Sequence, residues 1–214
     1  MAETGVALAI VVDNKDDSGT GRVRVRLRSQ PDQTLWARVA TPTTGAGRGV
    51  YFIPEEGDEV LVAFERGDTR FPYVIGSLWN GHDRPPVTNT DGKNDVRLIR
   101  TRKGHLLTFN DGAKGRVELA LNDGKHLSID DDGIRLEDGQ GNGLTIQGTP
   151  GALTIQTSGS ITIKASRISI ESSGTTDITA AGTLTLRGAL VNIKHLHSAR
   201  RSSASISSSA ANRS

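Results

Sequence analysis

The sequence predicts an all-β protein in two parts, and three observations carry this prediction. Apolar and polar residues alternate with a period of two between residues 6 and 79, which is the spacing of half-buried strands. From residue 107 onward the chain repeats an apolar-x-apolar pair, mostly every seven to ten residues, which is typical of a repeat architecture. Seven of the eight aromatic residues precede residue 84, so the two parts cannot be built around the same kind of core.

The composition of the 214 residues excludes several classes of protein. Only 35% of the residues are hydrophobic and 25 are Gly, which is a thin supply for one deep core. The absence of Cys excludes a disulfide framework, a thiolate zinc site and a cysteine nucleophile. No basic region precedes an apolar run at the N-terminus, so we expect no signal peptide and synthesis in the cytosol.

The first part predicts a small antiparallel barrel such as an OB-fold. The segment Arg22–Arg28 alternates without a fault, which places Val23, Val25 and Leu27 inward and four arginines outward, on what we interpret as a solvated face. Breakers rich in Gly, Pro and Asp separate the other strand candidates, and no stretch has a helical period. These candidates are Val6–Val12, Leu35–Ala40, Gly49–Ile53, Glu59–Glu65 and Tyr73–Trp79.

A barrel of this kind raises the alternative of a nucleic-acid-binding OB-fold. Binding of single strands needs a basic groove with exposed aromatic rings. Residues 1–84 hold 10 Lys and Arg against 12 Asp and Glu, and we expect Trp36 and Trp79 to be core residues. The sequence therefore favours no nucleic-acid partner.

The second part is a ladder that cannot bury its own apolar pairs as a flat ribbon. Each strand candidate offers two aliphatic side chains on one face and Ser, Thr or Asn on the other, with Gly, Asp and Asn in the turns. A single-chain solenoid and a trimeric β-prism both solve this problem, and the slim side chains weakly favour the trimer. The pairs are Leu107/Phe109, Val117/Leu119, Leu127/Ile129, Ile134/Leu136, Leu144/Ile146, Leu153/Ile155, Ile161/Ile163, Ile168/Ile170, Leu184/Leu186 and Val191/Ile193.

Two runs of residues carry a resemblance to a known family. The segment from Arg48 to Asp68, followed by Pro72 to Gly81, resembles the OB-fold of the phage baseplate assembly protein V family, which is shared with VgrG-type spikes of contractile injection systems. The run from Arg100 to Asp111 is similar to the start of the needle in that family. The resemblance implies a homotrimer whose OB-fold barrel docks on a baseplate hub and is followed by an intertwined triple-stranded β-helix.

On this resemblance we divide the chain into four segments. They are an OB-fold barrel at 1–84, a linker at 85–103, a triple-stranded β-helix at 104–197 and a Ser/Arg-rich tail at 198–214. The linker is too short for the lysozyme domain that some relatives insert at this place. We expect no hub domain fused to the barrel, which favours a short spike of the phage type.

The histidine pair His195-x-His197 is the candidate metal site. Residues at i and i+2 of a strand project from the same face, so three parallel copies would bring six imidazoles together. Six nitrogen ligands in a near-octahedral arrangement suit an iron ion, and the resemblance maps an iron-binding H-x-H of spike tips onto these residues. The alternative is a solvated pair ahead of a flexible tail, because 17 residues follow His197.

The sequence therefore predicts a structural protein and not an enzyme. Its acidic cluster at residues 130–132 is typical of an Asx-rich turn, and no nucleophile-elbow, Walker A or zinc-protease motif is present. We expect a central spike at the baseplate of a contractile phage tail that transiently pierces the target outer membrane. The alternative is a VgrG-type spike of a secretion system or tailocin, with a separate tip-capping protein.

Overall fold

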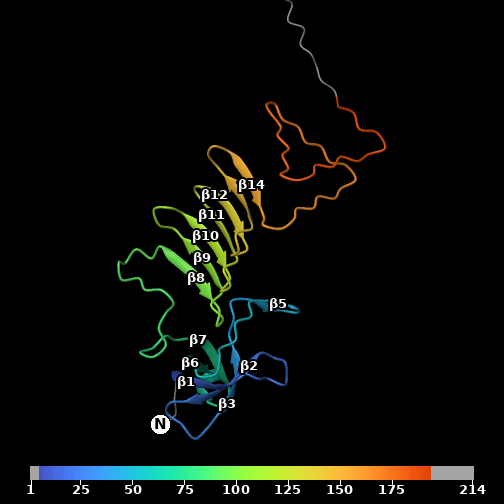
Figure 1. Cartoon of the computed structure of the whole chain (residues 1–214). Helices are drawn as coiled ribbons and strands as arrows, with labels where there is room; N and C mark the ends of the chain where they lie inside the picture. Colours follow the sequence, from blue (N-terminus) through green and yellow to red (C-terminus); the bar gives the residue numbers. More distant parts are fainter. Residues whose placement is uncertain (1–4, 194–214) are drawn as a thin grey trace, which may run out of the picture. The chain divides into compact units, whose positions relative to one another are not determined.

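The structure, a computed structural model, describes residues 5–193 and confirms the all-β prediction. Within these residues the only helical element is the single 3-10 turn η1 (Glu65–Gly67), and no helix has the length and hydropathy needed to cross a membrane. The chain divides into two compact units, residues 1–161 and residues 162–214. Regular strands lie in the first unit, as a closed barrel and a separate seven-stranded sheet (Figure 1).

The barrel is formed by five strands in the order β1-β2-β3-β7-β6, with β6 pairing back onto β1. All neighbours are antiparallel except β3 and β7, which are parallel. This closure leaves no open sheet edge in the barrel, as expected for the predicted OB-fold. The strands are β1 (Val6–Asp13), β2 (Arg22–Leu27), β3 (Leu35–Val39), β6 (Glu59–Phe64) and β7 (Pro72–Ser77).

The barrel core is aliphatic, which differs from the expectation that its aromatic residues would fill it. Phe64 is the one buried aromatic side chain among the described residues, while Trp36 and Trp79 are 37% and 69% exposed, so their assignment to the core was wrong. Small β-branched residues suffice because the interior of a five-stranded barrel is narrow. The buried residues are Ala9, Val11, Val23, Val25, Leu27, Ala37, Val60, Val62, Phe64 and Val74.

One strand candidate is not a barrel strand. Of the predicted segment Gly49–Ile53, only Gly49 pairs, in the short hairpin of β4 (Thr44–Gly45) and β5 (Arg48–Gly49). The hairpin and the residues after it connect β3 to β6 outside the barrel wall. The apolar segment at 50–53 therefore belongs to a connection and not to a sixth strand.

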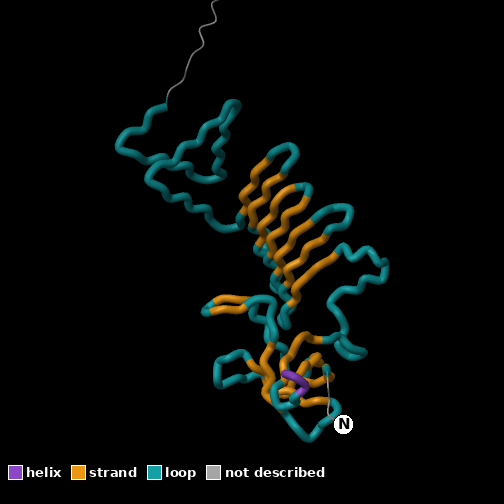
Figure 2. Tube along the Cα trace, turned by 180° about the vertical axis from the view of Figure 1, so that it is seen from behind, coloured by secondary structure: helices purple, strands orange, loops and turns teal. Residues whose placement is uncertain are grey.

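The seven-stranded sheet is a simple meander in chain order from β8 to β14, with every neighbouring pair antiparallel (Figures 1 and 2). Its first strand lies inside the segment 85–103 that we assigned to the linker, so the ladder begins earlier than predicted. The strands are β8 (Val96–Arg100), β9 (Leu106–Asn110), β10 (Arg116–Ala120), β11 (His126–Asp130), β12 (Gly133–Glu137), β13 (Gly143–Gln147) and β14 (Ala152–Gln156).

The remaining apolar pairs, from Ile161/Ile163 to Val191/Ile193, lie in residues that form no strand in the described chain. A strand requires a neighbour to complete its backbone hydrogen bonds, and these segments pair with no other segment of the described chain. In the intertwined β-helix expected from the resemblance, the neighbours would come from other copies. The prediction for this region therefore concerns the assembled protein.

We predict that Gly133→Ala disrupts the sheet. Gly133 has a φ of 144°, and an added Cβ would lie 1.9 Å from the backbone oxygen of Ile146 on the paired strand. The strain should lower the stability of the protein by about 1–3 kcal/mol, measured by thermal unfolding followed by far-UV circular dichroism. The matched control is Gly115→Ala, because Gly115 has no atom within 4 Å of the added Cβ. Equal melting of the two variants would contradict the close approach.

Candidate interaction surfaces

The arginine strand of the barrel is neutralised by carboxylates of the barrel itself. Arg22 pairs with Asp16 at 3.1 Å and Arg24 pairs with Asp13 at 3.0 Å. Both guanidinium groups also lie over the ring of Trp36, at 5.3 and 5.7 Å from its centroid. Because Arg22 and Arg24 lie over the Trp36 ring, the ring is less available for stacking on nucleic-acid bases.

Arg28, the last arginine of the alternating segment, pairs with Glu59 at 3.1 Å. The carboxylate of Glu59 is 6% exposed and also accepts a hydrogen bond from the side-chain amide of Asn80. Both carboxylate oxygens of Glu59 thus have a partner, which offsets the cost of burying a charged group. The interpretation of this strand as a solvated face was therefore incomplete, since three of its four arginines form ion pairs with carboxylates of the barrel.

Asp16 organises the turn before the arginine strand. Its carboxylate accepts hydrogen bonds from the hydroxyl groups of Ser18 and Thr20 and from the backbone and side chain of Arg22. The bond from Ser18 is the largest influence, and together with those from Arg22 and Thr20 it outweighs burial and holds the pKa of Asp16 far below its usual range. The folded barrel therefore stabilises the charged form of Asp16.

We predict that Asp16→Asn weakens the barrel in a pH-dependent manner. Because the pKa of Asp16 is lower in the folded chain than its ordinary value of 3.8, its stabilisation is present above that pH and is lost as the pH falls. The difference in unfolding free energy between the natural protein and the variant should be constant above about pH 5 and shrink below about pH 4. Tryptophan fluorescence reports the barrel, since both tryptophans lie at or before residue 79.

The control for this series is Asp17→Asn, a neighbour with an 86% exposed side chain that makes only a surface ion pair with Lys15. It should leave the unfolding profile almost unchanged. A pH-independent difference for Asp16→Asn would contradict the role of the charge.

The connection after the β4–β5 hairpin exposes aromatic side chains that we had not singled out as functional. Tyr51 is 80% exposed, Phe52 65% and their neighbour Val50 38%. The backbone of Val50 is held by a bond from its amide to Thr43 and by a bond from the Thr41 hydroxyl to its carbonyl. A fixed backbone that presents large apolar side chains is a feature of protein-binding surfaces. The missed signal was the run of four consecutive apolar residues between Gly49 and Pro54.

The largest apolar surface is one face of the seven-stranded sheet. The antiparallel register places the apolar pairs of successive strands directly opposite one another, so they form two continuous rows. The leucine row contains Ile99, Leu107, Leu119, Leu127, Leu136, Leu144 and Ile155. The isoleucine row contains Arg97, Phe109, Val117, Ile129, Ile134, Ile146 and Leu153.

No second layer in the described chain covers these rows. Phe109, Ile129 and Leu153 are 44%, 47% and 63% exposed, values that no packed core would show. A single-chain solenoid would have buried the pairs, so the structure contradicts that alternative for residues 96–156. Exposed apolar rows of this extent mark a protein interface.

The opposite face of the sheet is polar, and its charged side chains form ion pairs with residues of the same sheet. Ser128 is only 1% exposed although it lies on this face, between Glu118 and Arg135 in the register. Glu118 pairs with Arg116 at 2.9 Å, and Arg135 pairs with Asp130 at 3.0 Å. The two faces are thus chemically distinct, which is the pattern of a sheet with one buried and one solvated side.

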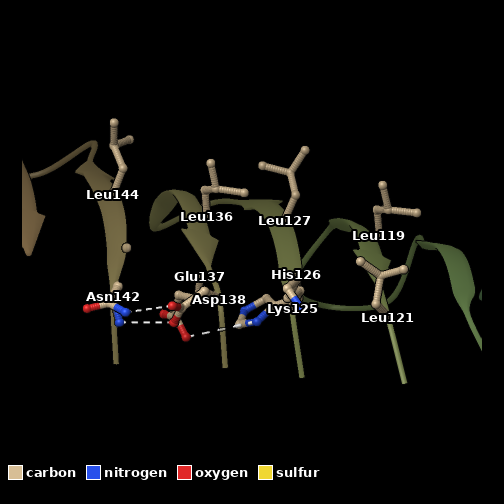
Figure 3. Close-up of a pocket in the computed structure, with 11 residues that line it drawn as sticks. Leu119, Leu121, Lys125, His126, Leu127, Leu136, Glu137, Asp138, Asn142 and Leu144 are labelled. Atoms are coloured by element: carbon tan, nitrogen blue, oxygen red, sulfur yellow. Dashed lines mark hydrogen bonds and ion pairs between the residues drawn. The ribbon is translucent and has the colours of Figure 1, made fainter. Parts of the chain in front are cut away.

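Along one side of the leucine row lies an open apolar groove of about 470 Å³. Figure 3 shows leucines of four neighbouring strands projecting in one direction, with the polar groups of turns and strand ends gathered away from their tips. In this polar group the Asn142 amide donates to Asp138 at 2.6 Å, and His126 lies 3.9 Å from Glu137. The groove is bordered by Leu119, Leu121, Leu127, Leu136 and Leu144.

The candidate metal ligands His195 and His197 lie outside the described residues. Within residues 5–193 no cluster of three or more His, Asp or Glu side chains is arranged to hold a metal ion. The acidic cluster at 130–132 forms a turn, as predicted, in which Asp130 accepts hydrogen bonds from the amides of Asp132 and Gly133.

Comparison with known proteins assigns the class. Residues 7–79 match the family model of the type VI secretion system/phage-baseplate injector OB domain. The barrel is therefore similar to an injector OB domain, and the chain resembles spike proteins of contractile injection systems. The resemblance to VgrG-like spikes drawn from the sequence is confirmed.

Individual relatives extend this similarity beyond the barrel. The actin cross-linking toxin VgrG1 of Vibrio cholerae is 26% identical over 176 residues, an alignment longer than the domain match that covers 72% of this chain and 16% of the relative. The spike proteins VgrG2a and VgrG5 of Pseudomonas aeruginosa are 37% identical over 79 residues and 34% identical over 111 residues. The alignment with VgrG2a covers 34% of this chain and 9% of the relative, and the alignment with VgrG5 covers 49% of this chain and 13% of the relative. The chain spans less than a fifth of the length of these relatives.

Proposed function

We propose that the protein is the central spike of a contractile phage tail, a homotrimer that docks to the baseplate hub through its barrel and pierces the target envelope with its β-structured needle. The observation that carries this proposal is the open apolar face of the β8–β14 sheet. Three copies that turn these faces toward a common axis would bury the leucine and isoleucine rows and leave the polar faces in water.

The hub-docking part of the proposal is supported by the exposed segment at residues 50–52. Tyr51 and Phe52 project from a connection that contributes nothing to the barrel wall. Aromatic side chains are enriched at protein interfaces, where they bury a large area at a small cost in conformational entropy. We therefore assign the hub contact to this side of the barrel.

A mechanical role agrees with the construction of the sheet. Six backbone ladders connect β8 to β14, and every turn between the strands is two to five residues long. Force along the stack would pass through these ladders within each copy and would be shared among three copies. Such a needle needs no catalytic residue, although one relative is named an actin cross-linking toxin.

A VgrG-type spike of a secretion system or tailocin, with a separate tip-capping protein, is the second candidate. It is favoured by the names of the relatives described above, which are VgrG proteins. The two candidates share the trimer and the barrel contact. They differ in the particle that contains the chain, which mass spectrometry of purified tails or secretion sheaths identifies.

We predict that Ile146→Asp abolishes the trimer while Thr145→Asp does not. The two residues are adjacent on β13 but lie on opposite faces, Ile146 in the isoleucine row and Thr145 on the polar face. Burying an unpaired carboxylate between copies is costly, whereas the same group on the solvated face is tolerated. Light scattering should give three times 22.7 kDa for the natural chain and for Thr145→Asp, and a smaller mass for Ile146→Asp. A natural chain of 22.7 kDa would refute the trimer.

The iron site at His195 and His197 remains a prediction, with six imidazoles from three copies as its ligands. We expect the double variant His195→Ala and His197→Ala to lose bound metal, measured by elemental analysis, while light scattering still gives the trimer mass. Replacement of His82, a 95% exposed residue of the barrel, is the matched control and should retain the metal. Unchanged metal content in the double variant would refute the site.

A further inference from the structure

A cleft of about 930 Å³ lies beside the first strand of the sheet, where the connection that follows β7 reaches β8. Figure 1 shows this connection as a long irregular loop between the two strands. The volume is within the range of about 300–1,000 Å³ that is typical of small-molecule sites. No described residue that borders the cleft belongs to the leucine row or the isoleucine row, so the cleft is separate from the apolar face of the sheet.

One side of the cleft is apolar. Trp79, which is 69% exposed and takes no part in the barrel core, borders this side. Val96 and Leu98 complete it, because the register places them opposite Asn110 and Thr108 on the otherwise polar face of the sheet. An exposed indole beside aliphatic side chains offers a flat apolar surface to a ligand.

The other side of the cleft is polar and provides both donors and acceptors. The side-chain oxygen of Asn89 accepts a hydrogen bond from the backbone amide of Asn94 at 2.7 Å. The side-chain oxygen of Asn110 accepts one from the amide of Gly112 at 2.9 Å. The two side-chain NH₂ groups therefore stay available as donors. Asp95 is half-buried, and its carboxylate makes no hydrogen bond or ion pair with the described residues, so it is an available acceptor.

The loop that carries these groups is held in shape by its own hydrogen bonds. The backbone oxygen of Asn89 accepts a bond from the amide of Gly92 at 3.2 Å, and that of Asp95 accepts one from Asp111 at 2.8 Å. Asn94 has a φ of 55°, in the left-handed region that Asn adopts more readily than most residues. A ligand would thus meet a site whose backbone is already arranged, which lowers the entropic cost of binding.

This combination of groups selects a ligand by its hydrogen bonding. None of the described residues that border the cleft is basic, whereas Asp91 and Asp95 are acidic, so phosphate and other anions are disfavoured. An ammonium group is only a donor and could not use the NH₂ groups of Asn89 and Asn110. A hydroxyl group both donates and accepts, so it matches the amide donors and the carboxylate acceptor together.

We propose that this cleft binds a neutral oligosaccharide. A pyranose ring has a face of C–H groups and a rim of hydroxyl groups, which correspond to the two sides of the cleft. The C–H face lies on the indole of Trp79, and the hydroxyl groups bond to Asn89, Asn110 and Asp95. All of these contacts come from one chain, so the inference goes beyond the proposed spike and does not require the trimer.

Isothermal titration calorimetry on the full-length protein tests the inference. The probes are two neutral trisaccharides, tri-N-acetylchitotriose and cellotriose, which distinguish an acetamido sugar from a plain hexose as the source of the hydroxyl groups. We expect at least one of them to bind with a millimolar or lower Kd. Glucose 6-phosphate is the anionic counterpart and should not bind, because the carboxylates of Asp91 and Asp95 repel it.

Two substitutions, one on each side of the cleft, should weaken the binding. Trp79→Ala and Asp95→Asn should each raise the Kd by about tenfold, the first by removing the stacking surface and the second by removing the charged acceptor. Trp79→Phe should restore part of the affinity, because an aromatic ring remains. The matched control is Trp36→Ala, whose ring lies beside Arg22 and Arg24 of the barrel, and it should change the Kd by less than about twofold. Far-UV circular dichroism checks that each variant is folded.

The absence of binding for both trisaccharides would overturn the inference, as would an equal loss of affinity in Trp79→Ala and Trp36→Ala. Binding of trilysine in place of the sugars would also overturn it and would assign the cleft to a cationic peptide. Light scattering on the same samples separates the inference from the proposed function. A monomer that binds the sugar would overturn the trimer alone, and a trimer that does not bind it would overturn this inference alone.

Discussion

Everything in the second half of the structure depends on the register of one antiparallel meander. Strands of equal length joined by short turns place each apolar pair opposite the next, and the period of two sends all of these side chains to the same face. A shift of one residue in any strand would move its pair into the polar face. The result is an apolar surface two residues wide that a single sheet has no means of burying.

The barrel, in contrast, buries its apolar side chains within one chain. Its five strands close on themselves, so residues such as Val25 and Val62 are buried completely without a partner. Arg22, Arg24 and Arg28 pair with carboxylates of the adjoining turns and strands, and the segment at 50–52 exposes Tyr51 and Phe52. The protein thus combines a barrel that buries its own core with a sheet whose apolar face no described residue covers.

The sequence by itself determined which faces of most strands are apolar and pointed to the similarity with VgrG-like spikes. Alternation in Arg22–Leu27 and the apolar pairs up to Leu153/Ile155 predicted side-chain orientation correctly, because a period of two is a local property of extended backbone. Only the tertiary structure decided which residues are covered. Trp36 and Trp79 are exposed because small aliphatic side chains already fill the narrow barrel, and Arg28 is paired because the closure of the barrel brings the distant carboxylate of Glu59 beside it. Residues 157–193 repeat the apolar-x-apolar pattern but form no strand in the described chain, because an alternating pattern predicts side-chain orientation and does not supply a hydrogen-bonding neighbour.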